Sequence, residues 1–375
     1  MTVDELTPEQ LWQSAQWYRA LTLAERAALP RAGTGRLPVP QETDRGQARL
    51  RTWTRQKPFE RDGLFAQRLA LETLTEQDLL ALLAESAESL RARTRAVPDW
   101  LVALREAFTA DDADRLGPVL RDVEKEHPLA GCLPSLGPLL ARALTTLDHR
   151  LRELHGRRGF LPFHTDLAAD AFLGDIAPFI LFQVSKPVVL ELHLARLDGR
   201  LRGDTKEARF QDFLEQLTSD GGMLAILSRY PVLARLLVES VDQCADYVYE
   251  FLGHLTADWE EICAAFAGGG DPGPLVEVDA GRGDRHRRGR SVLLLRFASG
   301  LRLLYKPKPM AIDVHFQDLV SWLNERGVQP ALKRLTILDR GQYGWSEFVA
   351  SSGCACEADV VAYDTDLPTH GLLET

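Results

Sequence analysis

The chain has 375 residues, of which 45% are hydrophobic and 26% are charged, and its formal net charge is −10. This composition is ordinary for a globular protein, and the length suggests two or three domains. The acidic excess argues against sequence-independent nucleic-acid binding, which depends on Lys and Arg neutralising phosphates. Five scattered cysteines favour a reducing compartment without a disulfide framework.

The N-terminus does not resemble a signal peptide, because Asp4, Glu5 and Glu9 fall where an apolar run would be needed. The most apolar stretch, Ile176 to Leu192, contains Pro178, Lys186 and Pro187. We expect it to be too short and too interrupted to span a bilayer. The sequence therefore predicts a cytoplasmic protein without a membrane span.

Residues 1 to about 265 read as helical. Thr75 to Asp78 has the pattern of a capping box, and Asp204 is an expected N-cap of the helix that carries Phe210, Phe213, Leu214 and Leu217. Tyr230 to Trp259 is expected to be helical, with Pro231 near its start, where proline is tolerated. Arg31 to Gln47, rich in Gly and Pro, is expected to be a surface loop.

The character of the chain changes at Ala267 to Pro274, where Gly and Pro mark a loop or domain boundary. Ser291 to Phe297 and Leu301 to Lys306 then read as two strands joined by a turn at Ser299-Gly300. We expect a helical region over 1–266, a small sheet-containing domain over 275–350 and a divergent tail over 351–375.

A helix should follow the two strands, with Asp313 as its N-cap and Gly327 closing it. Its expected apolar stripe is Phe316, Leu319, Val320 and Leu323. Two more strands are expected at Ala331 to Asp339 and Trp345 to Val349, joined by a turn from Arg340 to Gly344.

This order of strands and helix is that of the small lobe of a protein kinase, where a strand lysine holds ATP phosphates and the next helix gives it an acidic partner. Lys306 is at the place of that lysine, and Pro307 favours an extended backbone at Lys306. Asp318 is the candidate partner, with Glu325 as second choice. Backbone groups from Glu347 to Val349 would form the hinge that meets adenine.

A plainer interpretation stands beside this one. A lysine at the end of a strand is commonly a solvated edge residue that discourages edge pairing. The segment Gly283 to Arg290, with Asp284 and His286, has neither a G-x-G-x-x-G nor a Walker pattern, and by itself it suggests a polar turn. Cys354 and Cys356 form a C-x-C pair without a second pair of ligands nearby, a weak indication of zinc.

Several motifs together resemble one family, the dehydratase domain of class II (LanM-type) lanthipeptide synthetases. They lie at Gly283 to Val292, Leu304 to Lys308, Phe316 to Asn324 and Asp339 to Val349. Two helical stretches, Pro187 to Leu192 and Tyr230 to Leu236, are similar to that family as well. The resemblance covers roughly residues 5 to 360.

The resemblance implies an α+β, mostly α-helical chain in which a helical region precedes a lipid-kinase-like small lobe with an antiparallel sheet and one helix. It implies a cytoplasmic enzyme that uses ATP and Mg²⁺ to phosphorylate Ser and Thr of a precursor peptide and then eliminates phosphate. By resemblance, Lys306 is the phosphate-binding lysine, Asp284 and His286 belong to the phosphate loop, and Asp318 is the acidic helix position.

The sequence departs from the family after about Val361. The Thr-Asp-Leu at Thr365 to Leu367 is followed by Pro368 instead of the His of the family's catalytic loop. We therefore expect a fragment truncated before its catalytic loop, without catalytic residues, metal ligands or a zinc site, and inactive alone. Two alternatives stay open: one chain of a split synthetase, whose partner chain supplies the large lobe and cyclase, or a non-catalytic module that binds the precursor peptide.

Overall fold

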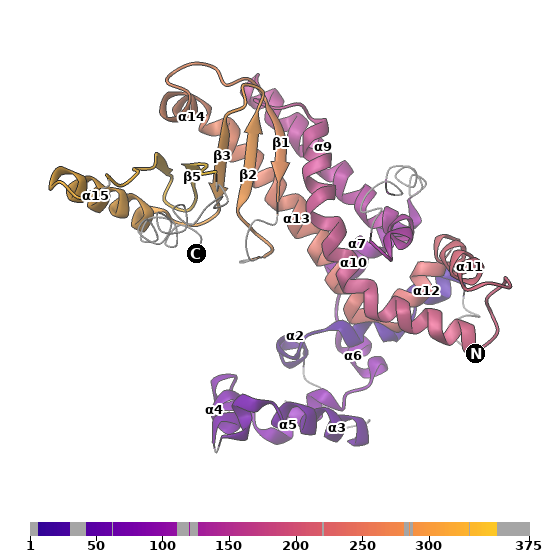
Figure 1. Cartoon of the computed structure of the whole chain (residues 1–375). Coiled ribbons are helices and arrows are strands. Elements are labelled where there is room, and N and C mark those ends of the chain that lie inside the picture. Colours follow the sequence, from indigo (N-terminus) through magenta and orange to yellow (C-terminus); the bar gives the residue numbers. More distant parts are fainter. Residues whose placement is uncertain are drawn as a thin grey trace. The chain divides into compact units, whose positions relative to one another are not determined.

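The computed structural model describes residues 7–30, 43–61, 63–110, 120, 127–219, 221–280, 285, 288–329 and 331–350. The chain forms two compact units, each built from two separate segments. Unit 1 comprises Met1–Arg142 and Phe179–Val241, and unit 2 comprises Ala143–Pro178 and Asp242–Thr375. The described part is mostly helical with one small antiparallel sheet, as the sequence predicts (Figure 1).

Helices make up the described part of unit 1. They are α1 (Pro8–Trp12), η2 (Ala15–Ala20), α2 (Leu23–Ala28), α3 (Thr43–Thr54), η3 (Lys57–Glu60), α4 (Leu64–Leu71), α5 (Glu76–Leu83), α6 (Ala87–Arg93), α7 (Asp99–Thr109), η4 (Ala130–Leu136), α11 (Lys206–Thr218) and α12 (Gly222–Arg229). Three long helices, α9 (Gly137–Arg158), α10 (Asp166–Leu197) and α13 (Pro231–Ala257), pass through both units.

Local capping explains where several helices begin. The capping box at Thr75 is confirmed, because the Asp78 backbone N–H donates to Thr75 Oγ1 at 3.1 Å and the Thr75 N–H donates to Asp78 Oδ2 at 2.9 Å. The cap of α11 is Thr205, whose Oγ1 accepts from the Ala208 N–H, and the prediction of Asp204 was wrong by one residue. A threonine here satisfies one of the helix's unpaired N–H groups.

The expected loop over Arg31 to Gln47 is wrong at its end, because α3 begins at Thr43. The remainder, 31–42, lies outside the described residues. Gly46 allows α3 to pack closely against Ala84, because a Cβ at position 46 would lie only 2.6 Å from Ala84 Cβ. The glycine that suggested a loop therefore serves a close approach between α3 and the end of α5.

Helix α10 runs over 32 residues and includes both Pro178 and Pro187. By length and composition alone it could cross a membrane, but 61% of its most apolar window is buried inside the protein. A helix that is apolar on all sides is typically buried in the core. Packing of the α10 side chains against their neighbours offsets the backbone hydrogen bonds that its two prolines remove.

The described strands form one five-stranded sheet in unit 2. They are β1 (Leu275–Asp279), β2 (Leu293–Phe297), β3 (Arg302–Lys306), β4 (Ile337–Asp339) and β5 (Gly344–Glu347), in the order β1-β2-β3-β5-β4 with antiparallel pairing throughout. The sequence did not predict β1, which is short and directly follows the Gly- and Pro-rich loop. The strand expected from Ala331 is confined to Ile337–Asp339.

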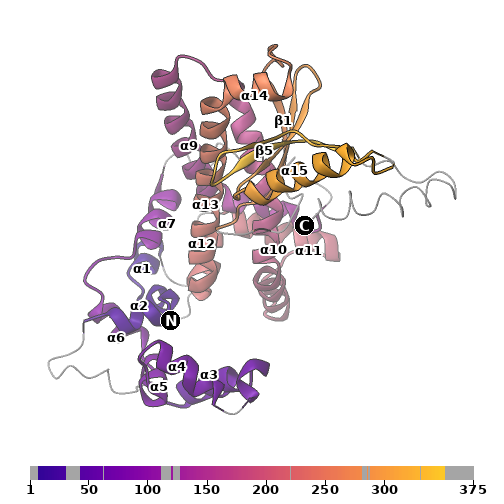
Figure 2. The same cartoon turned by 90° about the vertical axis from the view of Figure 1, so that its left-hand side faces the viewer.

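Aromatic side chains join one face of this sheet to the second half of α13, which runs along it in Figures 1 and 2. The rings of Phe251 and Tyr305 have centroids 5.2 Å apart, and those of Tyr305 and Trp345 are 4.9 Å apart. All three residues are completely buried. The short helix α14 (Trp259–Phe266) adds the contact of Trp259 with Phe297.

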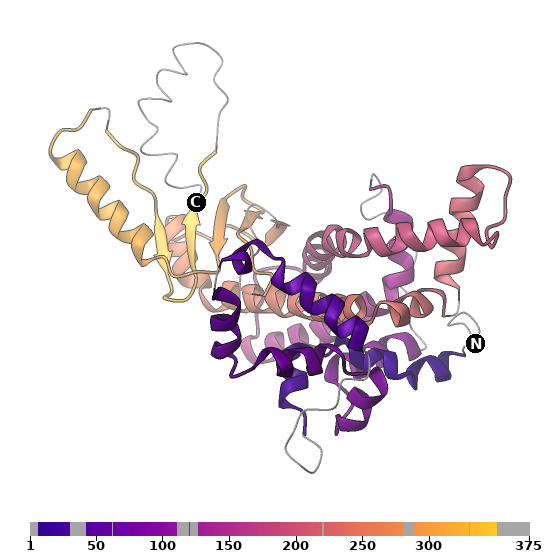
Figure 3. The same cartoon turned by 90° about the horizontal axis from the view of Figure 1, so that it is seen from below.

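Helix α15 (Ala311–Glu325) follows β3 and lies beside the sheet edge formed by β4 and β5 (Figure 3). Its N-cap is Met310, so the prediction of Asp313 was wrong. The expected apolar stripe is only partly buried, because Leu319 is 48% exposed while Gln317 is 4% exposed. Gly327 closes the helix with a φ of 79°, as predicted.

Candidate nucleotide-binding site

Lys306 is the last residue of β3 and is 9% exposed. In the sheet it pairs with Gly344 of β5. Helix α15 follows it in the chain after a short loop. Its Nζ lies 3.4 Å from Asp313 Oδ1. Burial at a fixed strand position does not fit the plainer interpretation of Lys306 as a solvated edge residue.

The acidic partner of Lys306 is Asp313 and not Asp318. Asp318 is largely exposed and its Oδ2 lies 3.7 Å from His315 Nδ1, so the predicted pairing is wrong. Asp313 stands in the first turn of α15, where the helix dipole favours a negative charge. The sequence contained a sign of this pairing, because Asp313 comes only seven residues after Lys306 at the start of the expected helix. The sequence-based prediction assigned Asp313 the role of N-cap instead.

The N-terminal end of α15 packs closely against β4 and β5 at Met310, Asp339 and Gly344, which we call the Met310–Asp339 corner. The Met310 N–H donates to Asp339 Oδ1 at 3.3 Å, and the Gly341 N–H donates to the same oxygen at 3.0 Å. A Cβ at Gly344 would lie 2.6 Å from Met310 Sδ and 2.7 Å from the Leu338 oxygen. Glycine opposite Lys306 therefore allows the helix that carries Asp313 to come close.

Tyr305 precedes Lys306 and points to the opposite face of the sheet, as neighbours in a strand do. Its hydroxyl lies 2.9 Å from His254 Nδ1, and the His254 ring stacks on Tyr343 at 3.6 Å. Burial lowers the pKa of His254 and raises that of Tyr305. A polar pocket of about 490 Å³ adjoins this face, lined by Glu250, His254, Arg290, Pro307, Arg340, Gln342 and Tyr343.

The basic loop before β2 is anchored where the structure describes it. Arg285 donates to the Asp175 backbone oxygen at 2.6 Å and to its Oδ1 at 2.7 Å. Arg290 pairs with Glu250 of α13. Burial raises the pKa of Asp175, although Arg285 and a bond from Cys244 act in the opposite direction. Asp284 and His286, predicted to bind phosphate, lie outside the described residues.

Glu347 ends β5, and its groups are already engaged. Its carboxylate binds Lys333 Nζ at 2.8 Å and accepts from the Thr336 N–H, while its own N–H donates to the Thr336 oxygen. Burial would raise the pKa of Glu347, but the bonds to Lys333 and Thr336 outweigh it and lower the pKa. Val349, also predicted to lie in the hinge, is half-buried.

The described residues contain no group of three or more His, Cys, Asp or Glu side chains close enough together to hold a metal ion. The carboxylate beside Lys306, Asp313, lies 3.4 Å from Lys306 Nζ. Cys354 and Cys356 lie outside the described range.

The comparisons with known proteins point the same way as the motifs. Residues 230–367 match the family model described as "Domain of unknown function (DUF4135)". The chain is 24% identical over 190 residues to the "Lacticin 481/lactococcin biosynthesis protein LcnDR2" of Lactococcus lactis subsp. lactis. The match includes 47% of this chain and 20% of that protein, so the chain spans about a fifth of its relative's length. These matches support a relation to the LanM-like lanthipeptide synthetases.

Proposed function

We propose that this chain supplies the ATP-binding lobe of a lanthipeptide synthetase dehydratase that acts on Ser and Thr of a precursor peptide in the cytoplasm. The single observation that carries the proposal is the buried Lys306, fixed at a strand end and paired with Asp313 of the following helix. The match to DUF4135 over 230–367 and the similarity to a lacticin 481/lactococcin biosynthesis protein support the choice of family.

The Lys306 ammonium would neutralise phosphate oxygens of ATP, and Asp313 would hold it in position, as an acidic helix residue does in kinases. In the proposed reaction, the γ-phosphoryl group moves from ATP to the side-chain oxygen of Ser or Thr. Removal of the α-proton then expels phosphate and leaves a carbon–carbon double bond. Phosphoryl transfer also needs a base and metal-binding groups, so ATP binding is a more direct test of this lobe than turnover.

The test is to replace Lys306 by methionine, which keeps the apolar stem and removes the charge. We expect ATP affinity to fall by roughly 10- to 100-fold, since a hydrogen bond to a charged group contributes about 1.5–3 kcal/mol. Lys308→Met is the matched control, because Lys308 is an exposed lysine two residues further along. Calorimetric titration with ATP gives both affinities, and thermal melting shows whether each variant is folded.

Equal ATP affinities of a folded Lys306→Met variant and the wild type would rule out this role for Lys306. Mass spectrometry of the precursor peptide tests the reaction itself, since each dehydration appears as loss of one water. The assay is run with the chain alone and with the products of neighbouring genes, which tests the hypothesis of a partner chain. Peptide binding that is indifferent to ATP and to Lys306→Met would instead favour a peptide-binding module.

A further inference from the structure

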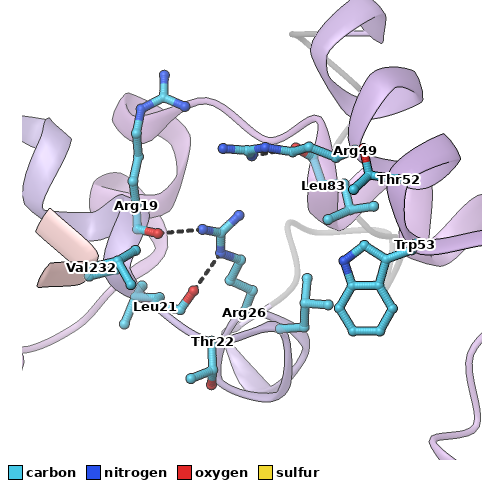
Figure 4. A pocket seen from close by; sticks show the side chains of 11 residues that line it. Arg19, Leu21, Thr22, Arg26, Arg49, Thr52, Trp53, Leu83 and Val232 are labelled. Carbon is cyan, nitrogen blue, oxygen red and sulfur yellow. Dashed lines mark hydrogen bonds between the residues drawn. The ribbon is translucent and has the colours of Figure 1, made fainter. Parts of the chain in front are cut away.

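Unit 1 contains a pocket of about 410 Å³ with arginines in an otherwise largely apolar lining. Arg26 of α2 rises into it and Arg49 of α3 extends towards the same space, while Trp53 forms one wall (Figure 4). Leu83 and Val232 add apolar surface. Among its described lining residues there is no Asp or Glu.

Arg26 is only 6% exposed, yet its hydrogen-bond partners are backbone oxygens. Its Nε donates to Leu21 at 2.9 Å, its Nη1 to Leu82 at 3.2 Å and its Nη2 to Arg19 at 2.7 Å. Carbonyl groups orient the guanidinium, but they carry no net charge to balance it. Two of its five N–H groups remain for a further acceptor.

The buried or half-buried carboxylates nearby in the chain are engaged by other arginines. Both oxygens of Glu85 accept from Arg93 Nη1 at 2.7 Å. Glu25 binds Arg235, with contacts of 2.6 and 2.9 Å. Glu85 helps to offset the charge of Arg26, but burial and the neighbouring Arg49 prevail and lower the pKa of Arg26 to about 10. A buried charge of this kind is costly unless an anion approaches it.

We propose that this pocket binds a carboxylate carried on an apolar group, with the carboxylate at Arg26 and Arg49 and the apolar part against Trp53. A planar guanidinium with two remaining N–H groups suits the two oxygens of a carboxylate. The apolar walls favour a singly charged ligand with a hydrocarbon part over inorganic phosphate. The carboxylate belongs either to a free organic acid or to an acidic side chain beside an apolar one in a peptide.

The site is tested by titrating the full 375-residue chain with hexanoate, with hexylamine, with inorganic phosphate and with an acetylated Leu-Glu-Leu amide. We expect hexanoate or the peptide to bind and hexylamine and phosphate not to bind. Arg49→Gln should weaken that binding by about 10-fold or more, as expected for loss of a charged hydrogen bond. Arg51→Gln, an exposed arginine on the same helix that does not line the pocket, should leave it unchanged.

Binding of the peptide without binding of hexanoate identifies a peptide side chain as the ligand, and binding of hexanoate identifies an organic acid. The proposal is overturned if neither binds, if hexylamine or phosphate binds as tightly, or if Arg49→Gln and Arg51→Gln have equal effects. Thermal melting confirms that both variants are folded. Lys306→Met should not change hexanoate affinity, so this result is independent of the ATP site.

Discussion

The partner of a charged residue depends on where a helix begins, as Lys306 shows. A helix that started at the expected cap, Asp313, would have placed Asp318 in its second turn, but α15 starts at Ala311 and puts Asp313 in its first turn. The type and spacing of both acids were visible in the sequence. Which of them meets Nζ depends on the Met310–Asp339 corner, whose two residues are 29 positions apart.

At this scale, His254 predicts a pH dependence of stability. Burial lowers its pKa below the ordinary value of about 6.5 for histidine, so on acidification the unfolded chain binds a proton before the folded chain does. The stability that neutral His254 contributes is therefore full above pH 6.5 and is lost as the pH falls through the lowered pKa. Glu250, Asp258 and Arg290 modulate this shift.

We expect His254→Gln to reduce the drop in the urea midpoint between about pH 8 and about pH 5.5. Glutamine can still form a hydrogen bond with the Tyr305 hydroxyl, but it does not titrate. His149→Gln, at an exposed position on α9, serves as the control and should keep the wild-type drop. A drop of the same size in all three proteins would contradict the prediction.

At the scale of elements, capping patterns and periodicity located α5, α11, α13, α15 and the β2–β3 hairpin, because these signals are local in the chain. These patterns missed β1. The strand expected from Ala331 to Asp339 ends where predicted but begins only at Ile337. The segment before β4 is instead held by side chains of α15: the Leu332 N–H donates to Asn324 Oδ1 and the Leu335 N–H donates to Gln317 Oε1, both at 2.8 Å. The polar Gln317 thus shares the buried face of α15 with Val320 of the expected apolar stripe.

Anchoring of the basic loop gives a prediction at this scale. Arg285→Ala should destabilise the protein by about 2–4 kcal/mol, because it leaves the carboxylate of Asp175, which is 5% exposed, without its cation. Arg288→Ala, at an exposed position in the same loop, should cost less than about 0.5 kcal/mol. Chemical unfolding of both variants gives the two values, and equal values would show that the pair does not anchor the loop.

At the scale of the whole molecule, each compact unit is assembled from distant parts of the chain. The expected break at Ala267 to Pro274 falls inside unit 2, whose sheet packs its aromatic face on α13. Tyr247 of α13 also donates to the Ser291 oxygen just before β2. The sheet therefore shares its core with helices that precede it.

We expect an excised segment of residues 275–350 not to fold, because it would expose Tyr305 and Trp345, each a burial of about 1.5–3 kcal/mol or more. The full 375-residue chain, in which the sheet packs on α13, should show a cooperative transition. Thermal unfolding followed by near-ultraviolet circular dichroism distinguishes the two. A cooperative transition in 275–350 alone would show that the sheet is a domain in its own right.

The sequence by itself determined the helical character of the described residues up to about 265, the β2–β3 hairpin and the place of Lys306 at a strand end. These features follow from local periodicity and from motifs that are contiguous in the chain. Only the tertiary structure decided that α10 continues through two prolines, that Asp313 pairs with Lys306 and that Arg26 is buried beside a pocket. Each of these depends on contacts between residues distant in sequence, whose packing and desolvation energies outweigh local preference.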